Sequence, residues 1–393
     1  MKTFLFCLFS VVLLSFTMAQ DKPQDKAAPV VDKKLDPLYF HINFRDILAS
    51  RKPQFRTARK GEVPELIWKI KTNGTVTAPI TMFENRLLIG TSMNNIYYVD
   101  MKKGEIDKTV GSGGAMLAWT SIRNNRYIIG MTWVGTVVSY PINWPTHSKT
   151  SYGGWKSNTV HPLGALNWPD GAIVTRRNDY PVLLELTEGT VVATPSLAWT
   201  HGEATAPLID SGKLLWLATS KGDLLGIDQK LTTVLSTIRL PSSYATALAY
   251  ENNVLYALTA NKDLFAYDLS SNTLKWQKQV SGNGVDSMVC ENGILYANAG
   301  DFYAIDSQDG KVLIEQPTLS FERFMRTKPV LTQNRIYSCD SEGHIFIFDK
   351  KTYKLLQVIN LDEDVAINFM VNEEVLYIST IVPHLYAIDV SLY

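Results

Sequence analysis

Short apolar stretches separated by turn residues repeat along most of the chain. From residue 76 onward, runs rich in Val, Ile, Leu and Tyr are broken by Gly, Asn and Asp. Each unit has one apolar run, a tight turn and a second run that ends in Asp, as in residues 86–90 followed by 96–100. Aliphatic and aromatic runs of this length favour strands, and the residues between them favour reversals. The pattern therefore predicts an all-β protein made of short strands.

The Asp that ends the second run measures the period of the repeat. It falls at Asp100, Asp228, Asp268, Asp306, Asp349 and Asp389, with gaps of 128, 40, 38, 43 and 40 residues. The long gap is about three periods, and residues 126–140 and 172–186 supply two weaker copies within it. A period near 40 residues with about four strands per copy is typical of a β-propeller. We predict eight blades, each a four-stranded antiparallel sheet.

The two ends of the repeat predict how such a propeller closes. Only four residues follow Asp389, which is too short for a further strand, while residues 66–70 form an isolated strand before the first copy. This strand carries Trp68, and the fourth strand of another copy carries Trp276. Pairing the isolated strand with the last copy removes an open sheet edge. We therefore expect residues 66–70 to complete the last blade of a propeller domain that covers residues 65–393.

The repeat ends resemble the Ala-x-Asp-x-x-x-Gly-Lys-x-x-Trp consensus of the pyrroloquinoline-quinone-like (PQQ-like) β-propeller repeat family. Residues 304–306 with Gly310 and Lys311 fit it, and residues 266–268 with Trp276 fit it apart from Asn in the Gly position. With eight copies and this length, the chain is most similar to the BamB-type outer-membrane-assembly scaffolds of that family. The resemblance implies a set of structural repeat positions: Trp68, Asp100, Asp228, Asp268, Trp276, Asp306, Gly310, Asp349 and Asp389.

The first 20 residues have the layout of a secretory signal. A short basic start with Lys2 precedes an apolar run over residues 4–16, and small residues precede a cleavage point after Ala19 or Gln20. The alternative is a membrane anchor, but the run is short for a span of the bilayer. No Cys follows the small residues, so lipid attachment is not expected. We expect an exported protein, periplasmic or secreted, that is not a lipoprotein and has no transmembrane span after cleavage.

Charge is distributed unevenly although the formal net charge is zero. Residues 21–60 hold ten basic and five acidic residues, whereas residues 61–393 hold 27 basic and 33 acidic residues. Residues 21–64 are therefore predicted to be a charged linker and basic N-terminal extension before an acidic propeller. The extension could dock on the propeller or reach an acidic partner. The balanced total predicts no nucleic-acid partner.

Catalytic chemistry has little support in the sequence. Quinoprotein dehydrogenases share the PQQ-like propeller, and the resemblance implies that such an enzyme would carry an adjacent Cys pair and calcium ligands. No Cys-Cys pair occurs, and no zinc-type His spacing, nucleophile elbow or phosphate loop is present. We expect no catalytic residues, no metal and no cofactor, PQQ included. Cys290 and Cys339 fall at opposite ends of their copies, so we expect no disulfide between them.

A binding face is predicted where the repeat is least regular. Seven of the nine Trp residues lie between residues 119 and 216, within copies two to four. Loops on one face of the predicted propeller carry Trp133, Arg176, Arg177, Trp199, His201, Glu203, Arg323 and Arg326. Aromatic and Arg side chains are effective anchors at protein interfaces. The alternative for the Trp residues is packing between blades.

These observations favour a non-enzymatic, exported scaffold for protein binding or assembly in the cell envelope. Its partner would be an envelope protein or peptide, which could add a strand at an exposed sheet edge. The propeller is expected to be monomeric. Two alternatives remain: an envelope ligand or glycan sensor that uses the Trp-rich face, and a quinone-dependent dehydrogenase that uses the central funnel.

Overall fold

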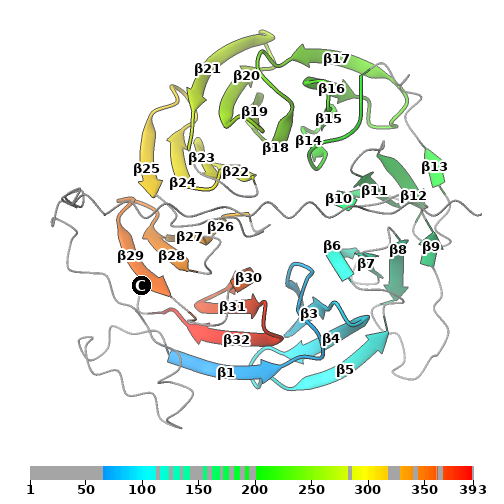
Figure 1. Ribbon diagram of the computed structural model, residues 1–393, viewed down its shortest axis with the longest axis vertical. Helices are drawn as coiled ribbons and strands as arrows, with labels where there is room; N and C mark the ends of the chain where they lie inside the picture. Colours follow the sequence, from blue (N-terminus) through cyan, green and yellow to red (C-terminus); the bar gives the residue numbers. More distant parts are fainter. Residues whose placement is uncertain are drawn as a thin grey trace, which may run out of the picture. The chain divides into compact units, whose positions relative to one another are not determined.

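A computed structural model describes residues 65–111, 116–123, 127–132, 136–141, 154–156, 162–168, 171–176, 181–185, 191–193, 201–281, 286–316, 328–339, 344–359, 361 and 366–391 (Figure 1). The predicted signal segment and the basic extension lie outside these residues. Every regular element among the described residues is a β-strand. The prediction of an all-β protein is confirmed.

The described strands form eight four-stranded antiparallel sheets, seven of them from consecutive strands. The first contains β2 (Thr81–Phe83), β3 (Arg86–Gly90), β4 (Asn95–Asp100) and β5 (Ile106–Gly111). The second contains β6 (Met116–Arg123), β7 (Tyr127–Thr132), β8 (Thr136–Pro141) and β9 (Gly154–Lys156). The third contains β10 (Pro162–Trp168), β11 (Gly171–Arg176), β12 (Val182–Glu185) and β13 (Val191–Ala193). The two weaker copies of the repeat therefore form sheets of the same kind.

The next four sheets follow the same plan. One contains β14 (Ile209–Asp210), β15 (Leu215–Ala218), β16 (Asp223–Ile227) and β17 (Val234–Arg239). Another contains β18 (Ala245–Glu251), β19 (Val254–Thr259), β20 (Asp263–Asp268) and β21 (Thr273–Gln279). A third contains β22 (Ser287–Glu291), β23 (Ile294–Asn298), β24 (Phe302–Asp306) and β25 (Val312–Gln316). The fourth contains β26 (Val330–Leu331), β27 (Arg335–Cys339), β28 (Ile345–Asp349) and β29 (Leu355–Ile359).

The remaining sheet joins the two ends of the described chain. Its strand order is β1-β32-β31-β30, from β30 (Ala366–Asn372), β31 (Val375–Thr380), β32 (His384–Asp389) and β1 (Glu65–Lys71). Strand β1 runs antiparallel to β32, with Glu65 opposite Asp389 and Lys71 opposite His384. The strand that comes first in the described chain is thus the outermost strand of a sheet whose other three strands come last (Figure 1).

Burial follows the position of a strand within its sheet. The middle strands β15, β16 and β19 are buried along their whole length, whereas the outermost strand β21 exposes most of its residues. Middle strands are apolar on both faces because each sheet packs against two others. For example, Trp216 and Ala218 of one sheet share a core with Leu255 and Phe265 of the next.

The packing between sheets also continues across the two ends of the repeat. Leu87 and Val99 of the first sheet share a core with Tyr377 and Leu385 of the β1–β32 sheet. Strand β6 contacts β2 and β3 on one side and β10 on the other. Neighbouring sheets therefore pack against each other, as expected where no single sheet can bury both of its apolar faces.

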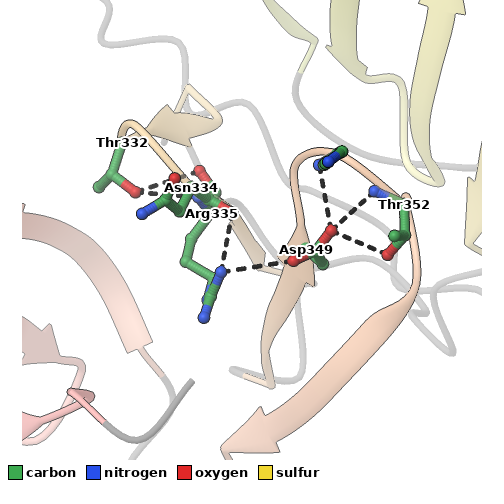
Figure 2. A network of polar contacts seen from close by, with 6 residues as sticks. Thr332, Asn334, Arg335, Asp349 and Thr352 are labelled. Atoms are coloured by element: carbon green, nitrogen blue, oxygen red, sulfur yellow. Dashed lines mark hydrogen bonds and ion pairs between the residues drawn. The ribbon is translucent and has the colours of Figure 1, made fainter.

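The strand-end Asp residues organise the turns that follow them. The Asp100 carboxylate accepts hydrogen bonds from the backbone N–H groups of Lys102 (2.9 Å) and Lys103 (2.8 Å). Figure 2 shows the turn at Asp349, where Thr352 donates both its N–H (2.7 Å) and its hydroxyl (2.8 Å) to the same carboxylate oxygen. The Arg335 guanidinium lies 3.4 Å from the other oxygen. A side-chain acceptor at this position fixes a tight reversal between two strands.

The Gly and Trp positions of the repeat connect neighbouring sheets. The indole N–H of Trp68 donates to the carbonyl of Met101 (2.9 Å), the residue after Asp100 in the next sheet. Gly104 has φ +70°, and a Cβ atom there would lie 2.6 Å from Cδ2 of the same indole. The spacing from Asp to Gly thus places the one residue type without a side chain at the point of the turn that lies against a Trp ring.

A second copy of this arrangement lies between two other sheets. Trp276 donates its indole N–H to the carbonyl of Ser307 (3.0 Å), the residue after Asp306. Gly310 has φ +75°, and a Cβ atom there would approach Cδ2 of Trp276 to 3.0 Å. Two residue types that are far apart in sequence therefore pack together at equivalent places in the repeat.

Register shifts typical of a β-bulge recur in the outermost strands. They occur in β1, β5, β13, β17, β21, β25 and β29. A bulge twists an edge strand and interrupts its row of hydrogen-bonding groups, so it protects an edge from pairing with another chain. These seven edges are consequently poor templates for a partner that adds a strand.

Candidate binding face

The structure describes part of the predicted binding face. His201 and Glu203 precede β14, and Arg176 is the last residue of β11. Five predicted residues lie outside the described residues: Trp133, Arg177, Trp199, Arg323 and Arg326. His201 and Glu203 are the predicted residues whose surroundings the structure describes in most detail.

Three segments meet beside His201. The residues before β14 pair with the turn between β15 and β16, because Glu203 donates its N–H to Ser220 Oγ (3.1 Å) and Ser220 donates its N–H to the Glu203 carbonyl (2.7 Å). The same turn contacts the chain after β17, since Leu240 donates its N–H to the Gly222 carbonyl (2.9 Å).

Two glycines allow this close approach. Gly202 has φ +84°, and a Cβ atom there would lie 2.6 Å from Ser220 Oγ. Gly222 has φ +83°, and a Cβ atom there would lie 3.4 Å from the Ser243 carbonyl oxygen and 3.9 Å from the Tyr244 nitrogen. Positive φ is readily adopted by glycine and strained for other residues, so the local sequence favours this arrangement.

Asp223 is the centre of the polar contacts at this site. Its Oδ1 lies 2.5 Å from Nη1 of Arg239, and its Oδ2 lies 3.2 Å from Nδ1 of His201. Asp223 begins β16 and Arg239 ends β17, and the two residues lie opposite each other in the sheet. The register of one strand pair therefore brings the carboxylate and the guanidinium together, and the segment before β14 adds the imidazole.

Exposure differs sharply between these three side chains. The Asp223 side chain is 9% exposed, whereas those of His201 and Arg239 are 32% and 65% exposed. Burial favours the neutral carboxyl, but hydrogen bonds and charge from Arg239 and His201 outweigh it and hold the pKa of Asp223 below its usual value. The site thus presents a guanidinium and an imidazole held by a buried carboxylate, and the 40% exposed Tyr244 lies on the adjoining segment.

Sequence reasoning missed Asp223, Arg239 and Tyr244. Asp223 stands at the start of a strand and not at the strand-end Asp position from which the repeat was measured. The pairing of β16 with β17 could have indicated the contact. Asp223 begins β16 directly after a tight turn, and Arg239 ends β17, so antiparallel pairing places the two residues opposite each other.

A model of the PQQ-like repeat family described as "outer membrane protein assembly factor BamB" matches residues 158–391. The chain belongs to this family. The match covers more than half of the chain and includes the Asp223 site.

Curated BamB proteins are similar to the chain at low identity. The outer membrane protein assembly factor BamB of Moranella endobia is 26% identical over 275 residues, covering 68% of this chain and 60% of that protein. The protein of the same name from Escherichia coli is 26% identical over 147 residues, covering 37% of this chain and 34% of that protein. The matches therefore span less than two thirds of either relative.

Solved structures share the fold. BamB from Moraxella catarrhalis superposes with a TM-score of 0.65 at 14% identity, covering 83% of this chain and all of that one. The computationally designed Ika8 protein superposes with a TM-score of 0.67 at 14% identity, covering 81% of this chain and 97% of that one. The chain is thus a β-propeller of PQQ-like repeats.

The family name raises the question of whether the residues suit a bound quinone. Cys290 and Cys339 form no disulfide and lie in different sheets, on β22 and β27. Among the described residues, no group of three or more His, Cys, Asp and Glu side chains is arranged to hold a metal ion. The donor set in the described residues does not fit PQQ with its calcium ion.

In the part of the chain that the structure covers, no helix is long and apolar enough to cross a membrane.

Proposed function

We propose that this protein is an exported, non-enzymatic β-propeller that serves as a protein-binding scaffold in outer-membrane protein assembly. The single observation that carries this proposal is the family match over residues 158–391, whose description names an assembly factor. The relatives of that name are similar over only part of their length, so the role is carried over as a proposal. A signal segment at residues 1–20 and a periplasmic location without a lipid anchor belong to the same proposal.

The architecture proposed for the scaffold is a closed propeller of eight blades. Two features support it: β1 pairs with β32, and the first and last sheets share a core around Leu87 and Leu385. A closed arrangement leaves no sheet without a neighbour, which suits a monomer.

The proposed binding face is the loop face around Asp223. It comprises the residues that the sequence indicates, Trp133, Arg176, Arg177, Trp199, His201, Glu203, Arg323 and Arg326, together with Asp223, Arg239 and Tyr244. Support comes from the fixed, exposed Arg239 and the exposed Tyr244, since Arg and Tyr are enriched among residues that dominate binding energy. The bulged outer edges favour a loop-face interaction over strand addition.

Cross-linking in intact cells of the native host tests this proposal. The full-length chain with a C-terminal affinity tag is cross-linked and purified, and the captured proteins are identified by mass spectrometry. We expect outer-membrane assembly components. A double variant, His201→Ala with Tyr244→Ala, should reduce their capture, whereas Lys213→Ala in the β14–β15 turn of the same sheet should not. Capture that lacks assembly components would contradict the scaffold role.

A further inference from the structure

We propose that Arg239 is the anchor by which this face holds a carboxylate of the partner protein, and that Asp223 is the residue that positions it. The inference rests on the proposed function, because it names the chemistry of the partner at the same face. The partner segment is expected to carry Asp or Glu beside an apolar side chain.

Arg239 uses only part of its hydrogen-bonding capacity. Within the described part of the chain, Nη1 is the one guanidinium nitrogen with a partner, and that partner is Asp223 Oδ1 at 2.5 Å. A guanidinium has five N–H donors in a planar fork that matches a carboxylate with two parallel hydrogen bonds. The side chain is 65% exposed, so the Nε and Nη2 donors remain accessible to a second carboxylate.

A neighbouring sheet shows that the buried aspartate does not need an arginine. Asp263 occupies the place of Asp223 in the β18–β21 sheet, where its N–H donates to Thr259 as that of Asp223 donates to Thr219. Both aspartates are buried: the whole residue is 7% exposed for Asp223 and 9% exposed for Asp263. The residue opposite Asp263 is Gln279. Arg239 is therefore a feature of this one sheet and not a requirement of the repeat.

Holding the guanidinium in place lowers the cost of binding. A long side chain normally loses rotamer freedom when it is immobilised at an interface, and that loss weakens association. The ion pair with Asp223 orients Arg239 before any partner arrives. Asp223 acts as a positioning residue because its own two oxygens are occupied by Arg239 and His201.

The exposed groups around Arg239 define the kind of partner. Arg239 is the exposed member of its ion pair, since its side chain is 65% exposed and that of Asp223 is 9% exposed, so a partner would meet the guanidinium. Tyr244 is 40% exposed, and its backbone lies against Gly222 next to Asp223. An exposed guanidinium and an exposed Tyr on neighbouring segments fit an acidic residue next to an apolar one.

Peptide selection on the full chain provides the test. Peptides are selected from a random dodecamer phage library, and each selected peptide is resynthesised with its Asp or Glu changed to the amide. We expect acidic peptides, weakened about tenfold or more by Arg239→Ala, by Arg239→Lys and by the amide change. In Arg239→Ala the amide change should add little, as expected for two groups in direct contact. Asp223→Asn should weaken binding although Arg239 is retained, and Lys213→Ala is the matched control.

The outcomes separate this inference from the proposed function. Selected peptides without acidic residues, or equal binding by the Arg239→Ala and Lys213→Ala proteins, would overturn the inference. Thermal melts of each variant show whether it is folded, and the Arg239→Lys protein keeps the charge if Arg239→Ala fails to fold. If cells still yield assembly components with Arg239→Ala at wild-type levels, the inference fails alone. If the wild-type chain captures none, the proposed function fails.

Discussion

At the scale of single residues, the repeat is defined by a few contacts that recur between sheets. Asp at the end of the third strand holds the following turn, Gly in that turn leaves room, and Trp from the previous sheet fills it. The two glycines with a positive φ beside a Trp ring, Gly104 and Gly310, show that the consensus reflects packing between sheets. The same scale includes the Asp223 site, whose Arg239 is replaced by Gln279 at the equivalent Asp263.

We expect Gly104→Ala to destabilise the protein by about 2–4 kcal/mol. The alanine would have to adopt a positive φ, and its Cβ atom would have to displace the Trp68 ring. Gly212→Ala is the matched control: it also has a positive φ, at +80°, but nothing lies within 4 Å of a Cβ there. It should cost only about 1–2 kcal/mol. Chemical denaturation of both variants measures the difference, and equal losses would show that the Trp68 contact contributes nothing.

Asp223→Asn should make the free energy of unfolding depend less on pH in the acid range. The pKa of Asp223 lies below its usual value, so its charged form stabilises the folded state above the unfolded pKa of about 3.9. That stabilisation is lost as pH falls through the lowered folded-state pKa. The variant should be about 1–3 kcal/mol less stable at pH 7, and the gap should narrow below pH 4. Melts from pH 7 to pH 3 test this, and a gap that widens in acid would contradict it.

At the scale of elements, the outermost strands determine how each sheet ends. The outermost strands β5, β17 and β21 expose several side chains to solvent, while Trp68 of β1 and Trp276 of β21 pack against the next sheet. Strand β1 differs because it comes from the opposite end of the described chain and carries Trp68. The last sheet therefore depends on a segment that is far away in sequence.

Removal of β1 should cost more than removal of the chain before it. A protein that begins at residue 73 lacks β1 and Trp68, and we expect a loss of at least about 3–5 kcal/mol, the cost of truncating one buried Trp. A protein that begins at residue 61 keeps β1 and is the matched control. Differential scanning calorimetry compares the two. If they melt at the same temperature, β1 does not hold the last sheet.

At the scale of the whole molecule, the proposed scaffold would use a fold shared with quinone enzymes for protein binding. A fold does not by itself determine function, so the proposal depends on the residues of the loops. The proposed binding face and the bulged edges are consistent with a partner that docks on loops.

Mixing the mature protein with PQQ and Ca²⁺ should give no bound chromophore after gel filtration, and no dye-linked oxidation of alcohols or sugars. The reason is that neither an adjacent Cys pair nor a suitable set of acidic ligands is present in the described residues. A known quinoprotein dehydrogenase treated in parallel serves as the positive control. Stoichiometric binding with turnover would contradict the scaffold proposal.

Much of the fold could be predicted because its signals are local. The turn residues and the strand-end Asp recur about every 40 residues. A period of this length with about four strands per copy predicts four-stranded antiparallel sheets. The site was predictable only in part. His201 and Glu203 stood out as polar residues in an irregular loop, whereas Arg239 looked like an ordinary charge at the end of an outer strand.

The amino-acid sequence by itself determined the strand-forming runs, the period and the turns, since each depends on residues within a few positions of one another. The tertiary structure alone decided in which register distant segments meet. The register of β1 against β32 and the meeting of His201, Asp223 and Arg239 depend on the pairing of strands and on glycines that allow close approach. Such contacts arise from the packing of whole sheets, so no local pattern of hydrophobic and polar residues records them.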